Sequence, residues 1–378
     1  MKKCFAWFFT LLFLIASFSP VYAKKNSPQS SAKNTVKDEK PEKAPKFPKG
    51  TWLNTPALTK KYFDNRVTLL YFWDYSAINC IREIGDLKKL QRTYRPFGLR
   101  VIWVHAPEFK FSGDPANVRK AVRRYGITQP VFLDNDFKLW ESYHVRSWPT
   151  KVIINKDGQI VKTFVGEENL QGTEIEVRKL LKEIDSGSSL PPMFFKKEKK
   201  GYATPSCGVM SGETYVGYKR AGWWGARVAN QEWVPKDKPL VFKDRGQRVE
   251  RGFFLSGMWE NREDDFKHSR QTKELTDYLG LIYLGNEVYS MLNSEQREGS
   301  KVYVTRDENP VPLEFRGQDM REDNEGRTYV LIDQPRLYYL ISNEDTDPHE
   351  IKLLTQDKGV TIQSFSFSNQ CLSDFDHR

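Results

Sequence analysis

The sequence has few of the residues that usually mark a metal or redox centre. The 378-residue chain contains four cysteines and five histidines. Cys80, Cys207 and Cys371 lie far apart in the sequence, so they form no Cys-x-x-Cys pair. Nothing beside His105 or His144 suggests metal ligation at the short ligand spacings that metal sites use. We therefore predict neither a metal site nor a bound cofactor.

Long apolar runs are also scarce, and the one near the start is typical of a secretory leader. Lys2 and Lys3 precede an apolar run from Phe5 to Phe18, and Val21-Tyr22-Ala23 offers a small-residue cleavage site. This run is too short to span a bilayer comfortably, and no later stretch approaches the required length. We therefore assign residues 1–23 to a signal peptide and predict an exported protein, periplasmic or extracellular, that does not span the membrane.

A strongly basic fold is absent too, although the formal net charge of the chain is +10. Residues 24–50 carry eight lysines against three acidic residues, and this composition predicts a disordered Lys/Pro/Ser spacer. Once the leader and this spacer are set aside, the rest of the chain carries only +3. We predict that it lacks the clustered basic face that phosphate binding needs, and hence that it binds no nucleic acid.

The most structured pattern begins with an apolar run, Val67 to Trp73, that predicts a buried strand. A polar turn follows, and from Cys80 apolar residues recur at helical spacing up to Tyr94. Further strand and helix patterns continue to a hairpin around Asp157-Gly158 and a last helix from about Thr173 to Ile184. Together they predict one mixed α/β domain over residues 51–185.

Beyond a second linker, residues 186–204, the pattern changes to short alternating segments separated by turn residues. This pattern predicts an all-β sandwich, jelly-roll-like, over residues 205–372. The sandwich is rich in aromatic residues, most of which we assign to its core. Neighbours in a strand or loop rarely both face inward, so we expect one of Trp223 and Trp224 to be exposed.

Four stretches of the first domain resemble the thioredoxin-like part of DipZ-type thiol:disulfide interchange proteins. They are Phe72 to Cys80, His105 to Phe109, Leu133 to Asp136, and Trp148-Pro149-Thr150. The second domain is similar to the same family's C-terminal module, a sandwich like those of carbohydrate-binding modules. Its matching stretches are Gly212 to Tyr218, Leu255 to Trp259, and Gln334 to Tyr338. The resemblance implies a thioredoxin-like α/β domain followed by an all-β sandwich.

The resemblance also implies site residues, and it breaks at two points. Ala77 stands where the family carries its attacking cysteine, so only Cys80, the resolving position, remains. No membrane-embedded electron-delivering domain precedes the thioredoxin-like part in this sequence. Pro149 matches the family's cis-proline, and with Trp73, Tyr75 and Trp148 it would form a rim that binds peptide. The chain is therefore expected to bind a peptide, protein or glycan partner through a degenerate Ala-x-x-Cys site.

Two other functions remain open at this point. Cys80 alone could serve a thiol-disulfide oxidoreductase or a peroxide reductase, with Glu108 either an acidic partner of the thiol or an exposed loop carboxylate. Alternatively, the chain could be a glycan-binding protein that acts through the sandwich. Cys207 and Cys371 lie at the two ends of the sandwich, and we predict a disulfide between them that leaves Cys80 free; a Cys80–Cys207 pair is the rival.

Overall fold

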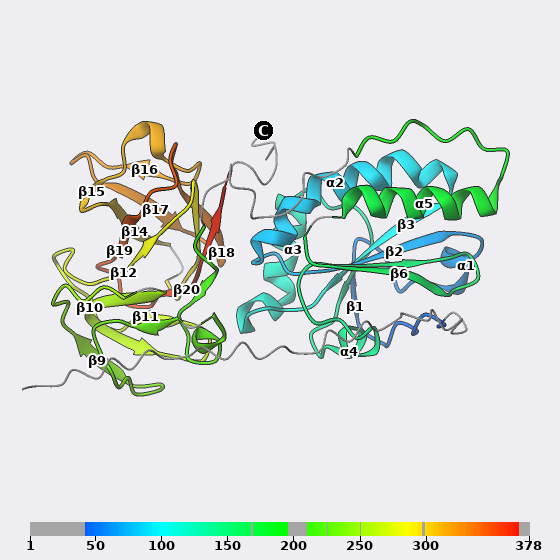
Figure 1. The fold of residues 1–378 in the computed structure, drawn as a ribbon. Helices are drawn as coiled ribbons and strands as arrows, with labels where there is room; N and C mark the ends of the chain where they lie inside the picture. Colours follow the sequence, from blue (N-terminus) through cyan, green and yellow to red (C-terminus); the bar gives the residue numbers. More distant parts are fainter. Residues whose placement is uncertain are drawn as a thin grey trace, which may run out of the picture. The chain divides into compact units, whose positions relative to one another are not determined.

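The structure is a computed structural model that describes residues 42–167, 169–195, 210–224, 226–249, 251–296 and 299–369. Pro41–Arg378 form one compact unit. The predicted signal peptide lies outside the described residues, and so do Cys207 and Cys371. The α/β domain and the all-β domain follow each other in the predicted order (Figure 1).

The first domain is built on a six-stranded sheet in the order β1-β4-β3-β2-β5-β6. Its strands are β1 (Thr51–Leu53), β2 (Val67–Trp73), β3 (Leu99–His105), β4 (Val131–Leu133), β5 (Thr150–Ile154) and β6 (Ile160–Val165). β2, β3 and β4 run parallel, whereas β1, β5 and β6 pair antiparallel to their neighbours. All seven residues of β2 are buried, as its uninterrupted apolar run predicts for a central strand covered on both faces.

Helices cover both faces of this sheet. α2 (Ile78–Tyr94), α3 (Pro115–Arg124) and α5 (Leu170–Ile184) bury apolar side chains against one face, where α2 and α5 lie side by side (Figure 1). α1 (Lys60–Phe63) and α4 (Lys138–Ser142) cover the other face. None of the helices in the described ranges combines the length and the apolar character that crossing a bilayer requires.

The α/β domain extends into both of the segments that were predicted to be linkers. Within the predicted spacer, the backbone N–H of Ala44 donates to the carbonyl oxygen of Gly158 at 2.9 Å, and Phe47 packs against the sheet. Beyond α5, the backbone N–H groups of Phe194 and Phe195 donate to the carboxylate of Glu174. Both predicted linkers therefore contain residues that contact the α/β domain. Their polar or proline-rich composition gave no sign of these contacts.

The second domain has fourteen strands, joined mostly by antiparallel pairing. β10 (Gly252–Asn261) belongs to both sheets of the sandwich: its first half pairs with β12, and its second half pairs with β9 and β11. Gly257 lies at the change of partner with φ +94°, and a Cβ there would meet the Asp277 carboxylate at about 2 Å.

The other strands are as follows: β7 (Thr214–Tyr215), β8 (Arg227–Val228), β9 (Pro239–Phe242), β11 (Phe266–His268), β12 (Tyr278–Tyr283), β13 (Glu287–Ser294), β14 (Ser300–Arg306), β15 (Asn309–Pro310), β16 (Arg321–Glu322), β17 (Thr328–Ile332), β18 (Arg336–Ser342), β19 (His349–Leu354) and β20 (Val360–Ser368). The core between the two sheets is apolar and includes Trp259, Tyr283 and Tyr338. These aromatic residues are core, as predicted.

Candidate functional site

Cys80 lies in the first turn of α2, directly after β2 and a short loop. The helix begins at Ile78, two residues earlier than predicted. The prediction missed this start because the N-cap residue, Ala77, has no side chain that could cap a helix. The Cys80 N–H donates to the Ala77 carbonyl at 3.0 Å, and the Tyr71 hydroxyl donates to the Cys80 carbonyl at 3.0 Å. The thiol is free and fully buried, so it is not presented to solvent as an attacking group would be.

The surroundings of Cys80 disfavour its thiolate. Burial raises the pKa of the Cys80 thiol well above its ordinary value, and the nearby carboxylates of Asp74, Glu83 and Glu108 raise it further. A hydrogen bond from the backbone at Asp74 acts in the opposite direction but does not outweigh them. Because the thiolate is the nucleophile in disulfide exchange, this environment disfavours the reactive form of Cys80.

Asp74, directly after β2, accepts hydrogen bonds from two loops around this site. Its carboxylate accepts the backbone N–H of Ser76 at 2.6 Å, the N–H of Glu108 at 2.6 Å and the Ser112 hydroxyl at 2.6 Å. The ring of His105 lies 3.6 Å from the same carboxylate and is fully buried. Burial lowers the pKa of His105, so the ring is neutral at pH 7 and supplies no positive charge to Cys80.

A buried ion pair lies one turn along α2 from Cys80. The Nζ of Lys151, on β5, donates to the Glu83 carboxylate and also to the Gly166 carbonyl at 3.3 Å. Both side chains of the pair are essentially inaccessible to solvent. Burial raises the pKa of Glu83 to about 7, because the Lys151 charge offsets only part of the desolvation. The pair fixes α2 to the sheet.

The start of α2 is covered by the outer face of the sandwich. Along β13, Val288 and Leu292 point into the sandwich core, whereas Tyr289 and Met291 belong to a second apolar cluster. This interface cluster consists of Ile78, Phe109, Tyr215, Tyr289, Met291, Leu337 and Tyr339. Ile78 is the neighbour of Ala77, which is itself only 8% exposed.

Glu108 is a polar anchor beside the interface cluster. Its carboxylate accepts the Tyr215 hydroxyl at 2.5 Å and the Arg220 guanidinium at 3.2 Å, and Arg220 stacks 4.7 Å from the Phe109 ring. Burial and the neighbouring Glu213 raise the pKa of Glu108 to about 8, against the opposing effect of Arg220. The prediction of an exposed loop carboxylate at Glu108 is wrong, since residues far along the chain bury it.

We expect Glu108→Gln to flatten the pH dependence of stability. The folded protein holds the Glu108 proton up to about pH 8, whereas the unfolded chain releases it near 4.5, so the free energy of unfolding should fall as pH rises between these values. Glu83 adds to this fall only up to about pH 7. The buried Glu213, whose pKa is also raised, adds a contribution of the same sign, so the variant should lose a substantial part of the slope, up to about 1.4 kcal/mol per pH unit, between pH 7 and 8. Urea unfolding at stepped pH measures it, and an unchanged slope there would refute the assignment.

Of the predicted peptide-binding rim, two members are core residues. Trp73 and Tyr75 are fully buried and pack around Trp103 and His105, because both faces of the sheet are covered. This part of the prediction is therefore wrong. The Trp148–Pro149 bond is cis, as the resemblance implied, but Pro149 is buried.

Trp148 keeps an accessible part. Its side chain is half-buried, its Nε1 donates to the Ala106 carbonyl at 2.9 Å, and its ring lies 4.5 Å from that of Trp140. Phe137 packs edge-on against Trp140 at 5.9 Å. We call Phe137, Trp140 and Trp148 the aromatic ledge. No pattern in the sequence indicated that Phe137 and Trp140 would join Trp148.

Several other residues singled out in the sequence do not contribute to this site. Trp223 and Trp224 lie in the short 3-10 helix η4 (Ala221–Trp224), but their side chains are outside the described residues. Trp233 is 71% exposed and so departs from the predicted core role. Within the described ranges, no three or more His, Cys, Asp or Glu side chains are placed to hold a metal ion.

Comparison with known proteins assigns both domains. Residues 39–181 match the family model described as Redoxin, and residues 211–368 match the one described as Thioredoxin like C-terminal domain. Protein DipZ of Mycobacterium bovis is 30% identical over 279 residues, which are 70% of this chain and 36% of DipZ. The chain therefore spans about a third of the length of that relative.

Two shorter relatives match the first domain alone. The thiol-disulfide oxidoreductase YkuV of Bacillus subtilis is 25% identical over 35% of this chain and 90% of its own length. The thiol-disulfide oxidoreductase ResA of Halalkalibacterium halodurans is 29% identical over 34% of this chain and 70% of its own length. This chain therefore carries a redoxin domain followed by a thioredoxin-like C-terminal domain, and it is similar to DipZ over 70% of its length.

Proposed function

We propose that this chain is an exported binding protein of the thioredoxin family, which holds a polypeptide partner and does not turn over disulfides. The observation that carries the proposal is the burial of Cys80, with its raised thiol pKa, behind an alanine at position 77. Disulfide exchange needs one thiolate to attack and a second thiol to resolve the mixed disulfide. An alanine methyl does neither, and a protonated, enclosed thiol cannot attack.

The aromatic ledge is the surface we assign to the partner. It is half-exposed, it lies beside the cis Trp148–Pro149 bond, and the hydrogen bond from Trp148 to Ala106 holds one ring in place. Rigid aromatic rings supply much of the binding free energy in protein interfaces because they bury a large area and lose little rotamer freedom. An extended polypeptide with apolar side chains fits this chemistry.

The test uses carboxymethylated insulin B chain as an unfolded polypeptide probe. We expect Trp148→Ala to weaken its binding about tenfold, as expected when an aromatic anchor is truncated. Fluorescence anisotropy of the labelled probe measures the affinity. Trp233→Ala removes an exposed tryptophan from the sandwich and should leave binding unchanged. Equal affinity of Trp148→Ala and the wild type would refute the ledge as the binding surface.

A second candidate is a redox enzyme that uses Cys80 alone, either as a monothiol oxidoreductase or as a peroxide reductase. It is favoured by the free state of the Cys80 thiol and by the oxidoreductase names of YkuV and ResA. We expect the wild type to show no catalytic reduction of insulin or of hydrogen peroxide in the presence of dithiothreitol. Turnover that disappears in Cys80→Ser would replace the binding proposal with this one.

A further inference from the structure

A hollow at the end of the first domain away from Cys80 is lined by neutral residues and by positively charged ones. Its volume is about 900 Å³, and its walls contain no aspartate or glutamate. Six of the lining residues are cationic: Lys61, Arg66, Lys88, Arg92, Arg95 and Arg100. We call this hollow the basic pocket. Arg66 directly precedes β2 and Arg100 is the second residue of β3, whereas Cys80 follows the opposite end of β2.

Three of the six cations donate hydrogen bonds to backbone carbonyls and not to carboxylates. Lys88 Nζ donates to the Tyr125 carbonyl at 2.7 Å, Arg66 Nη1 to the Asn65 carbonyl at 2.9 Å, and Arg100 Nη1 to the Leu99 carbonyl at 3.0 Å. These bonds orient the side chains but leave their charges uncompensated. Across the described part of the chain, no carboxylate lies within ion-pair distance of any of the six.

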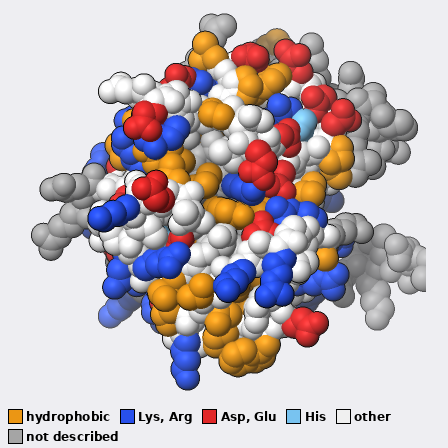
Figure 2. Space-filling view, turned by 90° about the vertical axis from the view of Figure 1, so that its left-hand side faces the viewer, with side chains coloured by type: hydrophobic (Ala, Val, Ile, Leu, Met, Phe, Trp, Pro, Cys, Tyr) orange, Lys and Arg blue, Asp and Glu red, His pale blue; other side chains and the backbone are white. Residues whose placement is uncertain are grey.

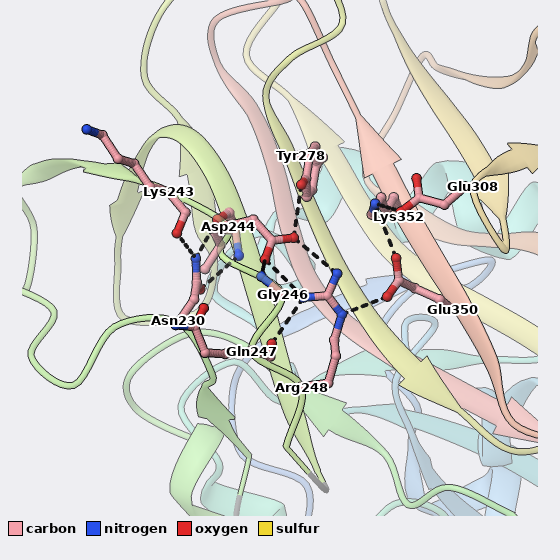
Figure 3. A network of polar contacts seen from close by, with 11 residues as sticks. Asn230, Lys243, Asp244, Gly246, Gln247, Arg248, Tyr278, Glu308, Glu350 and Lys352 are labelled. Carbon is pink, nitrogen blue, oxygen red and sulfur yellow. Dashed lines mark hydrogen bonds and ion pairs between the residues drawn. The ribbon is translucent and has the colours of Figure 1, made fainter.

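Some cations elsewhere in the molecule form ion pairs with carboxylates. In the sandwich, Arg248 pairs with Asp244 at 3.0 Å and with Glu350 at 2.7 Å, and Lys352 pairs with Glu350 at 3.2 Å (Figure 3). The upper part of the sandwich face drawn in Figure 2 likewise mixes positive and negative side chains, whereas Lys and Arg predominate in its lower part. The basic pocket differs from this network because its cations converge on one hollow without a carboxylate in its walls. It also corrects our expectation that the folded part has no clustered basic face.

The like charges of the pocket act on one another. The pKa of Arg100 is lowered by its partial burial, and then by the nearby charges of Arg66 and Arg95. Arg100 also lies over the Tyr62 ring at 5.8 Å, which limits how far the guanidinium can move away. A bound anion would relieve this repulsion, because it supplies the negative charge that the walls lack.

We propose that the basic pocket binds a small anion carrying two or more phosphate or sulfate groups. Four of the six cations are arginines, whose planar guanidinium groups match tetrahedral oxyanions through paired hydrogen bonds. A single phosphate engages only part of six cations, and the hollow has the volume of a small-molecule site. This site is separate from the aromatic ledge and does not depend on the function proposed there.

The test measures binding of tripolyphosphate by calorimetry at physiological ionic strength. We expect the triple variant Arg66→Gln, Arg95→Gln, Arg100→Gln to weaken binding at least tenfold. The matched control is Arg119→Gln, Lys120→Gln, Arg123→Gln, which removes three exposed charges from α3 and should change the affinity less than twofold. Arg100→Lys keeps the charge but loses the paired hydrogen bonds, and it should weaken binding severalfold even if the triple variant folds poorly.

The comparison probes decide the class of ligand. Orthophosphate and citrate should both bind more weakly than tripolyphosphate, the first for lack of charge and the second for lack of tetrahedral oxyanions. Absence of tripolyphosphate binding, or an equal loss in the control variant, would overturn the proposal. So would binding of phosphatidylglycerol vesicles or oligothymidylate through the pocket arginines when tripolyphosphate does not bind, since that would make the pocket part of a macromolecular surface.

Discussion

Lys151→Met is expected to lower the free energy of unfolding by about 3–5 kcal/mol at pH 8. The substitution leaves the Glu83 carboxylate buried without its partner, and the cost of an uncompensated buried charge exceeds that of losing the pair as a whole. At pH 5 the loss should be smaller, because Glu83 then takes up a proton and is neutral. Urea unfolding at both pH values measures the difference.

Two variants show whether the unpaired charge is the cause. The double variant Glu83→Gln, Lys151→Met should recover at least half of the lost stability, since it removes the charge as well as its partner. Lys120→Met, which replaces an exposed lysine on α3, should stay within about 0.5 kcal/mol of the wild type. If the double variant is as unstable as Lys151→Met, lost packing explains the effect and the ion pair does not.

Restoring the dithiol and uncovering it together should convert the chain into an insulin reductase. In Ala77→Cys the introduced thiol and that of Cys80 would reduce an insulin disulfide while forming a disulfide with each other, which dithiothreitol would then reduce again. The interface cluster covers this site, so we expect Ala77→Cys alone to be slow. Adding Met291→Asp places a carboxylate in that apolar cluster and should raise the rate at least tenfold by separating the two surfaces.

The controls separate uncovering from general damage. Met291→Asp without a cysteine at position 77 should remain inactive. Ala77→Cys with Ile282→Asp carries its new carboxylate on β12, where Ile282 is 46% exposed, and should be as slow as Ala77→Cys. Equal rates for Ala77→Cys and its Met291→Asp derivative would mean that the sandwich does not restrict access to this site.

The sequence was most informative where one physical signal dominates. The bounds of β2, β3 and β4 are those predicted, because each is a predominantly apolar run that stands out from the segments around it. The start of α2 was missed by two residues, since Ala77 gives no capping signal. Strands of two residues, such as β8 and β16, are too short to have a detectable period.

The site itself was only partly predictable, because its character depends on long-range contacts. Glu108 looked like an exposed carboxylate, and its burial requires Tyr215 and Arg220, more than a hundred residues away. The basic pocket was missed for a related reason. Its cations are scattered from Lys61 to Arg100 among acidic residues, so the balanced net charge of the folded part hid their convergence.

The covalent link between the two halves of the chain gives the interface cluster a further consequence. Two surfaces joined by one polypeptide meet at an effective concentration of roughly 1 mM. A contact with a dissociation constant of about 0.1 mM would then be closed about nine-tenths of the time. A free protein competing for Ile78 and Phe109 would see its own affinity reduced about tenfold by this tethered competitor. With a contact of that strength, the sandwich would exclude weak ligands from that face.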